Sequence, residues 1–359
     1  MKLRKEWHIE VGEGYSSPVT DGRQIYLHSR QGTNEVIRCI AWDSGNIIWS
    51  NEYRAAGRVH QAGADHGIGP KSTPCVVDAR LFTLGIGSIL SCFDTKSGKL
   101  LWRKQYEGQF PRPAPSCGTS MSPLVTDGLC IVHVGVDRQG ALIAYDTESG
   151  IERWRYEGDG PGYGSPIVTA LAGHRQLISP VSKFIAGFSI DTGKQLWRFP
   201  FPTRSTQNII TPVSDGRSIV VGGIAQITAK LVAGDKPEVL WDNRNWSMHM
   251  SSPIQVGERI IGTSTRDRGV IFCLDAKTGK LIWRSEDGMS RHVTLTRLGN
   301  EVAALTQHGR LILFRPDHEK LEPLASYDVT EKSTWANPLF LGRRIFIKDN
   351  TSLTAWRLD

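Results

Sequence analysis

The chain has 359 residues, and 43 Lys and Arg against 36 Asp and Glu give a formal net charge of +7. This excess is spread thinly and does not alternate with aromatic residues, so the sequence lacks the clustered basic patch of a nucleic-acid-binding protein. No apolar run reaches the length that spans a membrane. We therefore expect neither a nucleic-acid partner nor a membrane span.

The first residues do not have the pattern of a secretory leader. Lys2, Arg4 and Lys5 supply the positive charge of such a leader, but Glu6-Trp7-His8 stand where its apolar segment should begin. The sequence as it stands predicts a cytoplasmic location. If a leader has been removed, the expected location is periplasmic or secreted.

The most regular feature is an eleven-residue pattern that returns about every 40 to 55 residues. A small residue stands first, Gly seventh and Trp eleventh, and three copies carry Asp third. Each copy predicts a hairpin, because a Gly after Ser or Thr accepts positive φ in a tight turn. In chain order the copies span residues 39–49, 92–102, 144–154, 187–197 and 273–283.

A second landmark precedes the hairpins: Ser or Thr, once Asn, followed by Pro and an apolar run. Proline is tolerated at the first residue of a strand, so each copy predicts the start of one. The landmarks are Ser17-Pro18, Thr73-Pro74, Ser122-Pro123, Ser165-Pro166, Thr211-Pro212, Ser252-Pro253 and Asn337-Pro338. Four short strands in each unit of about 42 residues predict a propeller blade.

Counting the units predicts an all-β, eight-bladed β-propeller with four-stranded antiparallel blades in a single domain, residues 1–359. The chain ends on an apparent third strand at 353–358, and it begins with an apparent fourth strand at 5–10. We therefore expect the N-terminal strand to complete the C-terminal blade, which leaves no free edge between the chain ends. The expected blades are 14–50, 71–103, 119–155, 163–198, 209–242, 250–284, 292–328, and 335–359 with 5–11.

The hairpin pattern A-x-D-x-x-[ST]-G-K-x-x-W, with Ser/Thr-Pro opening each unit, resembles the tryptophan-docking repeat of the PQQ-type eight-bladed propellers. That superfamily includes quinoprotein alcohol dehydrogenases and the outer-membrane assembly lipoprotein BamB, so the resemblance specifies the fold and not the function. It implies that each Trp packs between neighbouring blades onto the small first residue of the motif. The expected structural docking residues are Trp7, Trp49, Trp102, Trp154, Trp197, Trp241 and Trp283, with Tyr327 in a degenerate seventh position.

The six cysteines are expected to be reduced and structural. Cys39, Cys92 and Cys273 occupy the small first position of the motif, where a buried thiol replaces Ala. Cys75 and Cys130 fall in strand runs, and Cys117 lies in a loop. No C-x-x-C pair is present.

In the resembling fold, ligands lie at the mouth of the central channel, where each outer strand returns to the next inner strand. The residues just before each Pro landmark therefore form the candidate ligand-binding set, since a concave site with convergent polar groups is the default binding hypothesis. They are Tyr15, His66, Lys71, Ser120, Tyr163, Gln207, Asn208, His249 and Trp335, with Ser16, Ser72, Gly164, Ser251 and His292 beside them. An equally weighted alternative is that these positions are polar only because they meet water.

Two return segments, 53–72 and 107–121, are longer than the others, and long loops on a rigid scaffold often carry function. The first holds His60, Asp65 and His66, which are metal-ligand residue types. Their spacing matches no known ligand frame, so we predict a solvated loop there and no metal.

Three functions remain open at this stage. The favoured one is a non-catalytic scaffold, similar to BamB, that is monomeric, binds a protein or peptide and needs no cofactor. The second is a quinoprotein dehydrogenase, which the resemblance would supply with PQQ, Ca²⁺ and an Asp base. The sequence lacks the long inserts and adjacent-Cys disulfide of those enzymes, and only Asp65 and Asp267 lie near the mouth. The third is a sensor that binds a sugar or peptide fragment in the channel.

Overall fold

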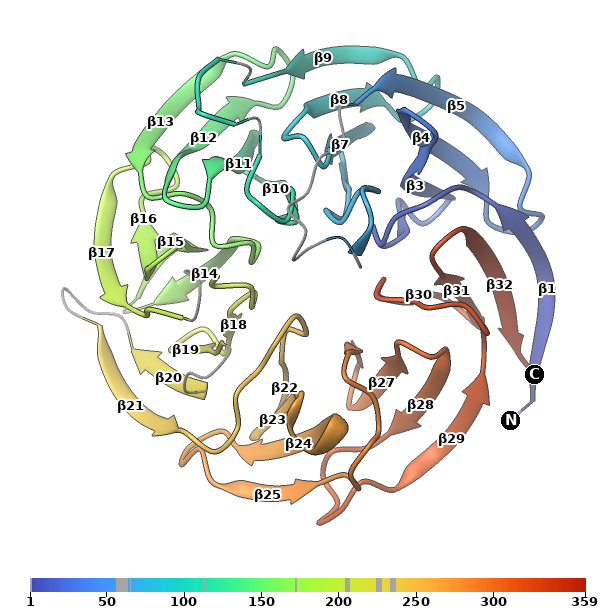
Figure 1. Cartoon of the computed structure of the whole chain (residues 1–359), viewed down its shortest axis with the longest axis vertical. Helices are drawn as coiled ribbons and strands as arrows, with labels where there is room; N and C mark the ends of the chain where they lie inside the picture. Colours follow the sequence, from blue (N-terminus) through green and yellow to red (C-terminus); the bar gives the residue numbers. More distant parts are fainter. Residues whose placement is uncertain are drawn as a thin grey trace. The chain divides into compact units, whose positions relative to one another are not determined.

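The structure is a computed structural model that describes residues 2–55, 64, 66–106, 108–112, 114–171, 173–203, 207–223, 228–232 and 237–359. These residues form eight four-stranded antiparallel sheets, the strand content and order of an eight-bladed β-propeller (Figure 1). The chain groups into two compact units, Met1–Pro161 with Ala336–Asp359, and Gly162–Trp335. The fold class predicted from the sequence is confirmed.

The first unit contains four blades. Its strands are β2 (Val19–Thr20), β3 (Gln24–Gln31), β4 (Asn34–Ala41) and β5 (Ile47–Arg54) in blade 1; β6 (Cys75–Val77), β7 (Arg80–Leu84), β8 (Leu90–Asp94) and β9 (Leu100–Lys104) in blade 2; β10 (Leu124–Thr126), β11 (Leu129–Val136), β12 (Gln139–Asp146) and β13 (Glu152–Gly158) in blade 3; and β30 (Leu339–Leu341), β31 (Arg344–Lys348), β32 (Ser352–Leu358) and β1 (Leu3–Glu10) in blade 8.

The second unit contains the other four. Its strands are β14 (Ile167–Leu171), β15 (His174–Pro180), β16 (Phe184–Phe188) and β17 (Gln195–Pro200) in blade 4; β18 (Val213–Ser214), β19 (Ile219–Val221), β20 (Thr228–Val232) and β21 (Glu238–Asn243) in blade 5; β22 (Ile254–Val256), β23 (Arg259–Ser264), β24 (Val270–Asp275) and β25 (Leu281–Arg284) in blade 6; and β26 (Val293–Leu298), β27 (Glu301–Thr306), β28 (Arg310–Phe314) and β29 (Pro323–Asp328) in blade 7. A short 3-10 turn, η3 (Arg266–Arg268), follows β23.

The two landmarks of the sequence have clear structural roles. At all seven Pro landmarks the first strand of the blade begins at the residue after the proline. In the hairpin, the third-position Asp closes the turn: Asp94 accepts hydrogen bonds from the Ser97 amide at 2.7 Å and from its hydroxyl at 2.6 Å. Gly98 then takes φ +70°, a value that only glycine adopts without strain.

Burial follows the position of a strand within its blade. The second and third strands, such as β3 and β4, are buried along almost their whole length, whereas the outer strand β5 alternates exposed and partly buried residues. The apolar clusters lie between neighbouring sheets, for example Phe82 and Leu90 of blade 2 against Val132 and Ile143 of blade 3. Stability therefore depends on how adjacent blades join.

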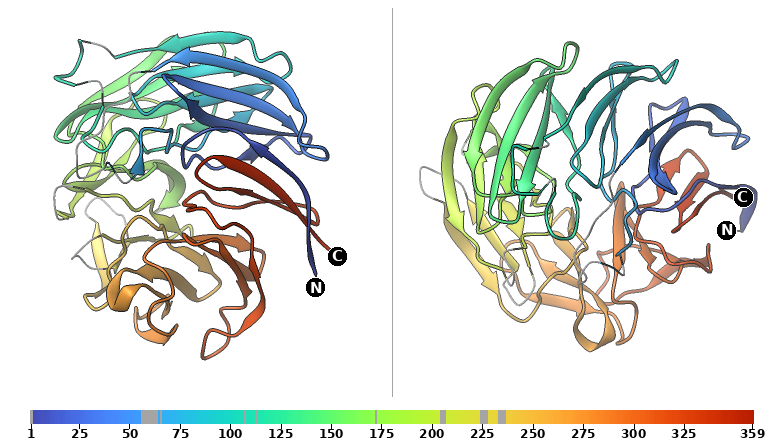
Figure 2. Two further views of the ribbon diagram at one scale, coloured as in Figure 1. Left: turned by 45° about the vertical axis from the view of Figure 1, so that its right-hand side comes forward. Right: turned by 45° about the horizontal axis from the view of Figure 1, so that its top comes forward.

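The N-terminal strand completes the C-terminal blade, as predicted. β1 pairs antiparallel with β32 from Leu3↔Leu358 to Glu10↔Ser352, and Figures 1 and 2 show the two termini side by side. Glu6 of β1 forms an ion pair with Arg344 of β31, which holds the strand from a second side. No helix in the described ranges is both long and apolar enough to cross a membrane.

Candidate functional site

The Ser/Thr of the Pro landmarks links one blade to the next. The Ser17 amide donates to the Thr73 hydroxyl at 3.4 Å, and the Thr73 amide donates to the Ser122 hydroxyl at 3.0 Å. Asn337 donates to Ser17 in the same unit, and the second unit repeats the arrangement from Ser165 to Thr211 to Ser252. Each hydroxyl thus satisfies a buried amide of the neighbouring blade, which explains why Ser or Thr precedes the proline.

In the first unit, the predicted site residues hold return segments together. The amides of Tyr15 and Ser16 both donate to the Pro70 carbonyl, at 2.9 and 3.0 Å. Lys71 donates through Nζ to the Cys117 carbonyl at 2.6 Å, which fixes the second long loop. Burial lowers the pKa of Lys71 to about 8, so this side chain stays mostly protonated at neutral pH but loses its proton more readily than an exposed lysine.

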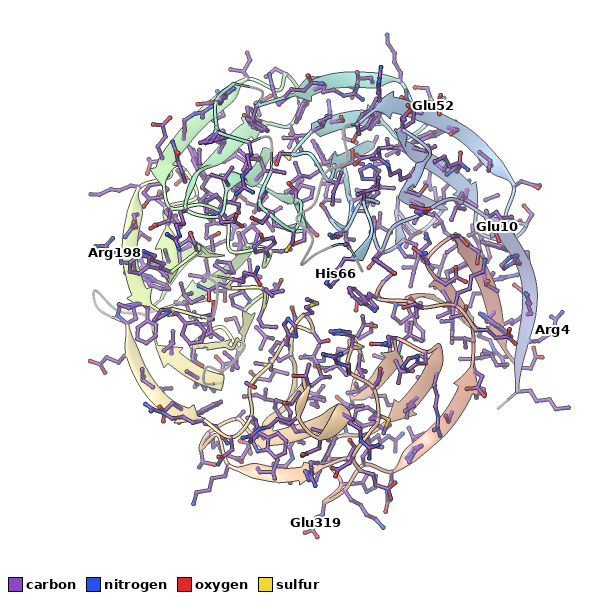
Figure 3. All side chains as sticks on the ribbon, in the orientation of Figure 1. Arg4, Glu10, Glu52, His66, Arg198 and Glu319 are labelled. Atoms are coloured by element: carbon purple, nitrogen blue, oxygen red, sulfur yellow. The ribbon has the colours of Figure 1, made fainter. Side chains whose placement is uncertain are left out.

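The remaining predicted residues of this unit are more open. Ser120 and His66 are each half-buried, and Figure 3 shows His66 on the side of the unit opposite Glu10 and Glu52, which project from the outer strands. His60 and Asp65, which sequence analysis grouped with His66, lie outside the described residues. In the described part of the chain, no group of three or more His, Cys, Asp or Glu could hold a metal ion.

In the second unit, one of the predicted polar residues serves the fold. Asn208 is 1% exposed and donates through Nδ2 to the carbonyls of Val181 at 2.7 Å and Phe184 at 3.3 Å. It therefore holds the β15–β16 turn and has little surface to offer a ligand. Gln207 beside it is half-buried. Tyr163 is 8% exposed and has φ +81°, a backbone conformation that bulky residues rarely adopt.

Three aromatic rings from successive return segments lie in a row in this unit. The centroids of His249 and His292 are 5.9 Å apart, and those of His292 and Trp335 are 4.7 Å apart. The structure thus brings His249 and Trp335 together through His292. A ligand-binding role for this row, and for the other predicted mouth residues, stays a prediction.

The described mouth residues do not suit a calcium–quinone pair, because a hard cation needs several oxygen ligands with charged carboxylates among them. Asp267, one of the two carboxylates considered from the sequence, forms an ion pair with Arg284 of the outer strand β25 at 2.9 Å. Asp65, the other, lies outside the described residues. Asn208 donates through Nδ2 to two backbone carbonyls, and its Oδ1 is buried away from the surface.

Tryptophan docking joins blades through one packing contact and one hydrogen bond. The Trp49 indole covers Gly98 of the next blade's hairpin, where an added Cβ would lie 2.5 Å from the ring. Its Nε1 donates to the Thr95 carbonyl of that hairpin at 2.8 Å. The same two contacts recur for Trp7 with Gly45 and Trp42, for Trp102 with Gly150 and Thr147, and for Trp241 with Gly279 and Ala276.

The partner of the Trp differs in detail from what the resemblance implied. The small first residue faces the Trp within its own blade, as Cys39 faces Trp49 across the β4–β5 ladder. The residue met in the neighbouring blade is the seventh, the turn glycine. All six cysteines are free thiols in the structure, and burial raises the pKa of Cys39 to about 11, which keeps that thiol protonated in the core.

Trp154 is buried and faces Ala144 of its own blade, as Trp49 faces Cys39. Two other predicted docking residues depart from the pattern in their hydrogen bonding. Trp197 donates to Gln176 Oε1 at 2.6 Å, also within its own blade. Trp283 packs edge-on against Phe314 at 5.9 Å, and its buried Nε1 has no hydrogen-bond partner among the described residues. The hairpin that follows Trp283 lacks the motif, which explains the missing acceptor.

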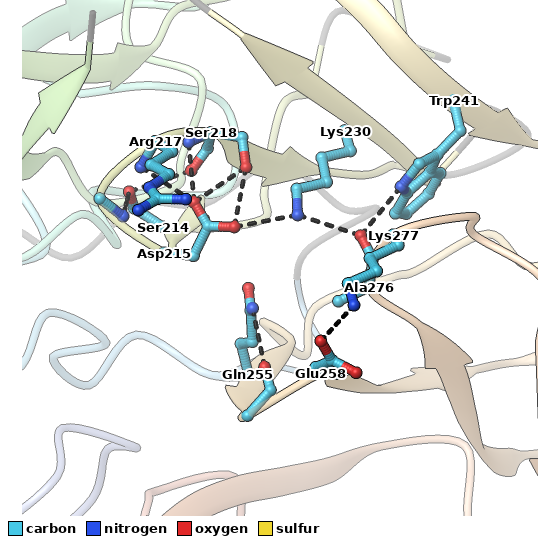
Figure 4. Close-up of polar contacts among 12 residues, drawn as sticks. Ser214, Asp215, Arg217, Ser218, Lys230, Trp241, Gln255, Glu258, Ala276 and Lys277 are labelled. Carbon is cyan, nitrogen blue, oxygen red and sulfur yellow. Dashed lines mark hydrogen bonds and ion pairs between the residues drawn. The ribbon is translucent and has the colours of Figure 1, made fainter.

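Blade 5 replaces the small first residue with Lys230, which faces Trp241 across the β20–β21 ladder. Figure 4 shows that Lys230 Nζ reaches both Asp215, at 2.9 Å, and the Ala276 carbonyl of blade 6, at 3.0 Å, while Trp241 donates to the same carbonyl at 3.1 Å. Burial would raise the pKa of Asp215, but the hydrogen bond from Lys230 and those from Ser218 and the backbone lower it to about 2. Lys230 therefore links blade 5 to blade 6.

Blade 1 contains a buried cluster of polar side chains that sequence analysis missed. Glu35 is fully buried and accepts hydrogen bonds from Tyr53 at 2.6 Å and from the Ile86 amide of blade 2 at 2.9 Å, and it contacts His28 at 3.1 Å. Burial alone would raise the pKa of Glu35, but these hydrogen bonds hold it below its usual value. Although Glu, His and Tyr are catalytic types, this cluster has no exposed surface and is structural.

A family model described as outer membrane protein assembly factor BamB matches residues 33–285, with a second match over 181–322. The chain belongs to this family. The BamB of Burkholderia pseudomallei is 24% identical over 88% of this chain and 77% of its own length. The quinohemoprotein alcohol dehydrogenase ADH-IIG of Pseudomonas putida is 26% identical over 36% of this chain and 19% of its own length.

Solved structures show the same fold. The BamB of Moraxella catarrhalis superposes with a TM-score of 0.71 at 15% identity, covering 99% of this chain and 100% of that one. The quinohemoprotein alcohol dehydrogenase of Comamonas testosteroni gives 0.69 at 14% identity, covering 99% of this chain but 76% of that one. Both confirm the eight-bladed fold of BamB-type chains, and the family relation places this chain among bacterial PQQ-like repeat proteins.

Proposed function

We propose that this protein is a non-catalytic scaffold that binds a protein or peptide partner during assembly of outer membrane proteins. The observation that carries the proposal is the extent of the match. The chain and the Moraxella catarrhalis BamB cover one another almost completely, whereas about a quarter of the Comamonas testosteroni dehydrogenase has no counterpart here. The location that fits this function is the periplasm.

The outer strands offer a surface suited to a protein partner. In four of them the residue directly before the docking Trp is apolar and roughly half exposed: Ile48 (48%), Leu101 (43%), Leu196 (46%) and Leu240 (55%). Within each unit, these exposed apolar side chains offer contact points that a protein partner could cover. We expect the protein to be a monomer that needs neither PQQ nor Ca²⁺.

The test is complementation of a bacterium that lacks its own BamB. We expect the protein, expressed with a periplasmic leader, to restore the level of assembled outer membrane proteins. Ile48→Ser with Leu101→Ser should weaken that restoration, whereas Leu324→Ser, which is 44% exposed on the outer strand of blade 7, should not. Failure of the unaltered protein to restore assembly would argue against the scaffold.

The similarity to quinohemoprotein dehydrogenases makes PQQ-dependent catalysis the second candidate. It predicts that PQQ with Ca²⁺ raises the melting temperature, because a ligand bound only by the folded state stabilises it by about 2.7 kcal/mol at a hundredfold excess over its Kd. A saturable rise together with dye reduction by alcohols would replace the scaffold proposal with the enzymatic one. We expect no shift.

A further inference from the structure

A pocket of about 550 Å³ lies at one end of blade 3, within the first unit. Gln109 and Phe110 of the second long loop form one wall, and Gln139, Arg155 and Glu157 of blade 3 form the other. Its volume falls within the range of about 300–1,000 Å³ that is usual for small-ligand sites. None of the mouth residues chosen from the sequence lines it.

Two paired glycines and one aromatic ring also line the pocket. Gly140 of β12 lies directly opposite Gly158 of β13 in the ladder. A Cβ on Gly140 would lie 2.5 Å from the Val134 carbonyl oxygen, and one on Gly158 would lie 2.9 Å from the Tyr156 hydroxyl, so both positions are closely packed. The ring of Phe110 packs on the core between blades 2 and 3.

The loop that carries Phe110 is held in place from outside the pocket. Asp137, in the β11–β12 turn, accepts hydrogen bonds from Arg112 at 2.8 Å and from the Ser116 hydroxyl at 2.6 Å. Figure 1 shows the segment after β9 passing over the ends of β11 and β12. These hydrogen bonds attach Arg112 and Ser116 to the β11–β12 turn of blade 3.

The charges of the pocket balance. Arg155 donates through Nε and Nη2 to both oxygens of Glu152, at 2.9 and 2.8 Å, and its Nη1 lies 3.9 Å from Glu157. The positive charge is therefore already paired, and an anionic ligand would meet a second carboxylate. Together the guanidinium, the carboxylate and two side-chain amides present hydrogen-bond donors and acceptors at short range.

We propose that this pocket binds a neutral saccharide. Vicinal hydroxyl groups both donate and accept hydrogen bonds. They therefore suit a pocket whose side chains include donors and acceptors: Arg155, Glu157, Gln109 and Gln139. The apolar face of a sugar ring would lie against Phe110. This site is separate from the assembly role, and each proposal can fail without the other.

The test is saturation-transfer difference NMR on the full-length protein with maltose, cellobiose and N,N′-diacetylchitobiose at millimolar concentration. We expect at least one of them to bind, and Phe110→Ala to weaken it by about tenfold or more, since the aromatic contact is lost. Glu157→Gln should also weaken binding, whereas Glu319→Gln, at an exposed position on the second unit, should leave it unchanged (Figure 3).

Circular dichroism and the melting temperature identify any variant that fails to fold, and Gln139→Ala then takes the place of Phe110→Ala. No binding by any of the three sugars, or binding that survives both Phe110→Ala and Gln139→Ala, would overturn the proposal. Binding of the tripeptide Gly-Phe-Gly in place of the sugars, with loss in Phe110→Ala, would also overturn it and would assign the pocket to peptides.

Discussion

The first unit joins its blades by repeating one contact, whereas the second unit uses a different contact at almost every joint. Trp7, Trp49 and Trp102 each cover a turn glycine and donate to a carbonyl of the next hairpin. Among the described residues of the second unit, Trp241 makes both contacts, and there Lys230 shares its acceptor. Blade 4 also meets blade 5 through a hydroxyl pair, Thr169 with Ser214 at 2.6 Å.

This difference shows what a repeated fold requires of its sequence. Each joint must fill the space between two sheets and satisfy the buried polar groups there, and several combinations of residues do both. At Trp283 a buried indole N–H has no partner among the described residues, so this joint fails part of the requirement. Substitutions at matched positions in the two units measure how much each kind of contact between blades contributes to the free energy of unfolding.

The largest effect is expected at Glu35, which adds a buried contact to the joint between blades 1 and 2. Glu35→Ala leaves His28, Tyr53 and the Ile86 amide without their acceptor, and it should lower the free energy of unfolding by about 3–5 kcal/mol in urea denaturation. Glu52→Ala, on the exposed outer strand of the same blade, should change it by less than about 0.5 kcal/mol. Similar losses in both variants would show that the buried cluster contributes nothing particular.

Docking on the turn glycine is tested by a pair of Gly→Ala variants. Gly98 and Gly32 both have positive φ, so alanine costs about 1–2 kcal/mol at either position. At Gly98 the new methyl also collides with Trp49, whereas nothing lies within 4 Å at Gly32. Gly98→Ala should therefore be the more destabilising by a further 1–3 kcal/mol or so in the same measurement. Equal effects would mean that the indole moves aside freely.

Lys230 of the second unit gives a pH-dependent prediction. Lys230→Met removes the partner of Asp215 and should cost about 1–3 kcal/mol at pH 7. The folded pKa of Asp215, about 2, lies below the ordinary 3.8, so its stabilisation is present above pH 4 and is lost as the pH falls toward 2. The unaltered protein should lose more stability over that interval than Lys230→Met does.

The matched control is Lys277→Met, because Lys277 pairs with Glu258 on the exposed surface. We expect no measurable change in the free energy of unfolding there, because solvent screens an exposed ion pair. Parallel acid unfolding curves for the unaltered protein and Lys230→Met would contradict the role assigned to the Lys230–Asp215 pair.

The smallest effect is expected when a docking tryptophan that has a hydrogen-bond acceptor is compared with one that has none. Trp49→Phe keeps an aromatic ring but loses the hydrogen bond to the Thr95 carbonyl, so it should cost about 1–2 kcal/mol. Trp283→Phe removes a buried donor that has no acceptor, so it should be close to neutral. If Trp283→Phe lowered the free energy of unfolding as much as Trp49→Phe, both indoles would contribute by packing and the hydrogen bond of Trp49 would add nothing.

Sequence analysis predicted the fold well because its signals are local. The turn glycine, the landmark proline and the strand alternation each depend on a few neighbouring residues, and their spacing alone determined the number of blades and the pairing of the chain ends. The outer strands, such as β5 and β13, run a few residues past the docking Trp, beyond the predicted blade limits of 50 and 155.

The contacts between blades could not be predicted in the same way. That Trp49 meets Gly98, or that Lys230 reaches Ala276, depends on residues about 45 positions apart in sequence whose sheets stack face to face. Nor could the sequence distinguish Asn208, which serves the backbone of a turn, from an amide that faces a ligand. The pocket beside Phe110 was missed because its lining comes from a loop and from two strands of blade 3, which carry no common sequence pattern.

The pairing of β1 with β32 has a consequence for biosynthesis. The ribosome completes blades 1 to 3 early, but β32, the partner of β1, emerges only after the whole of the second unit has been made. At about 5–20 residues per second, β1 must wait many seconds with an unpaired edge. A nascent chain of this architecture therefore depends on keeping that edge apart from other strands until β32 has been made.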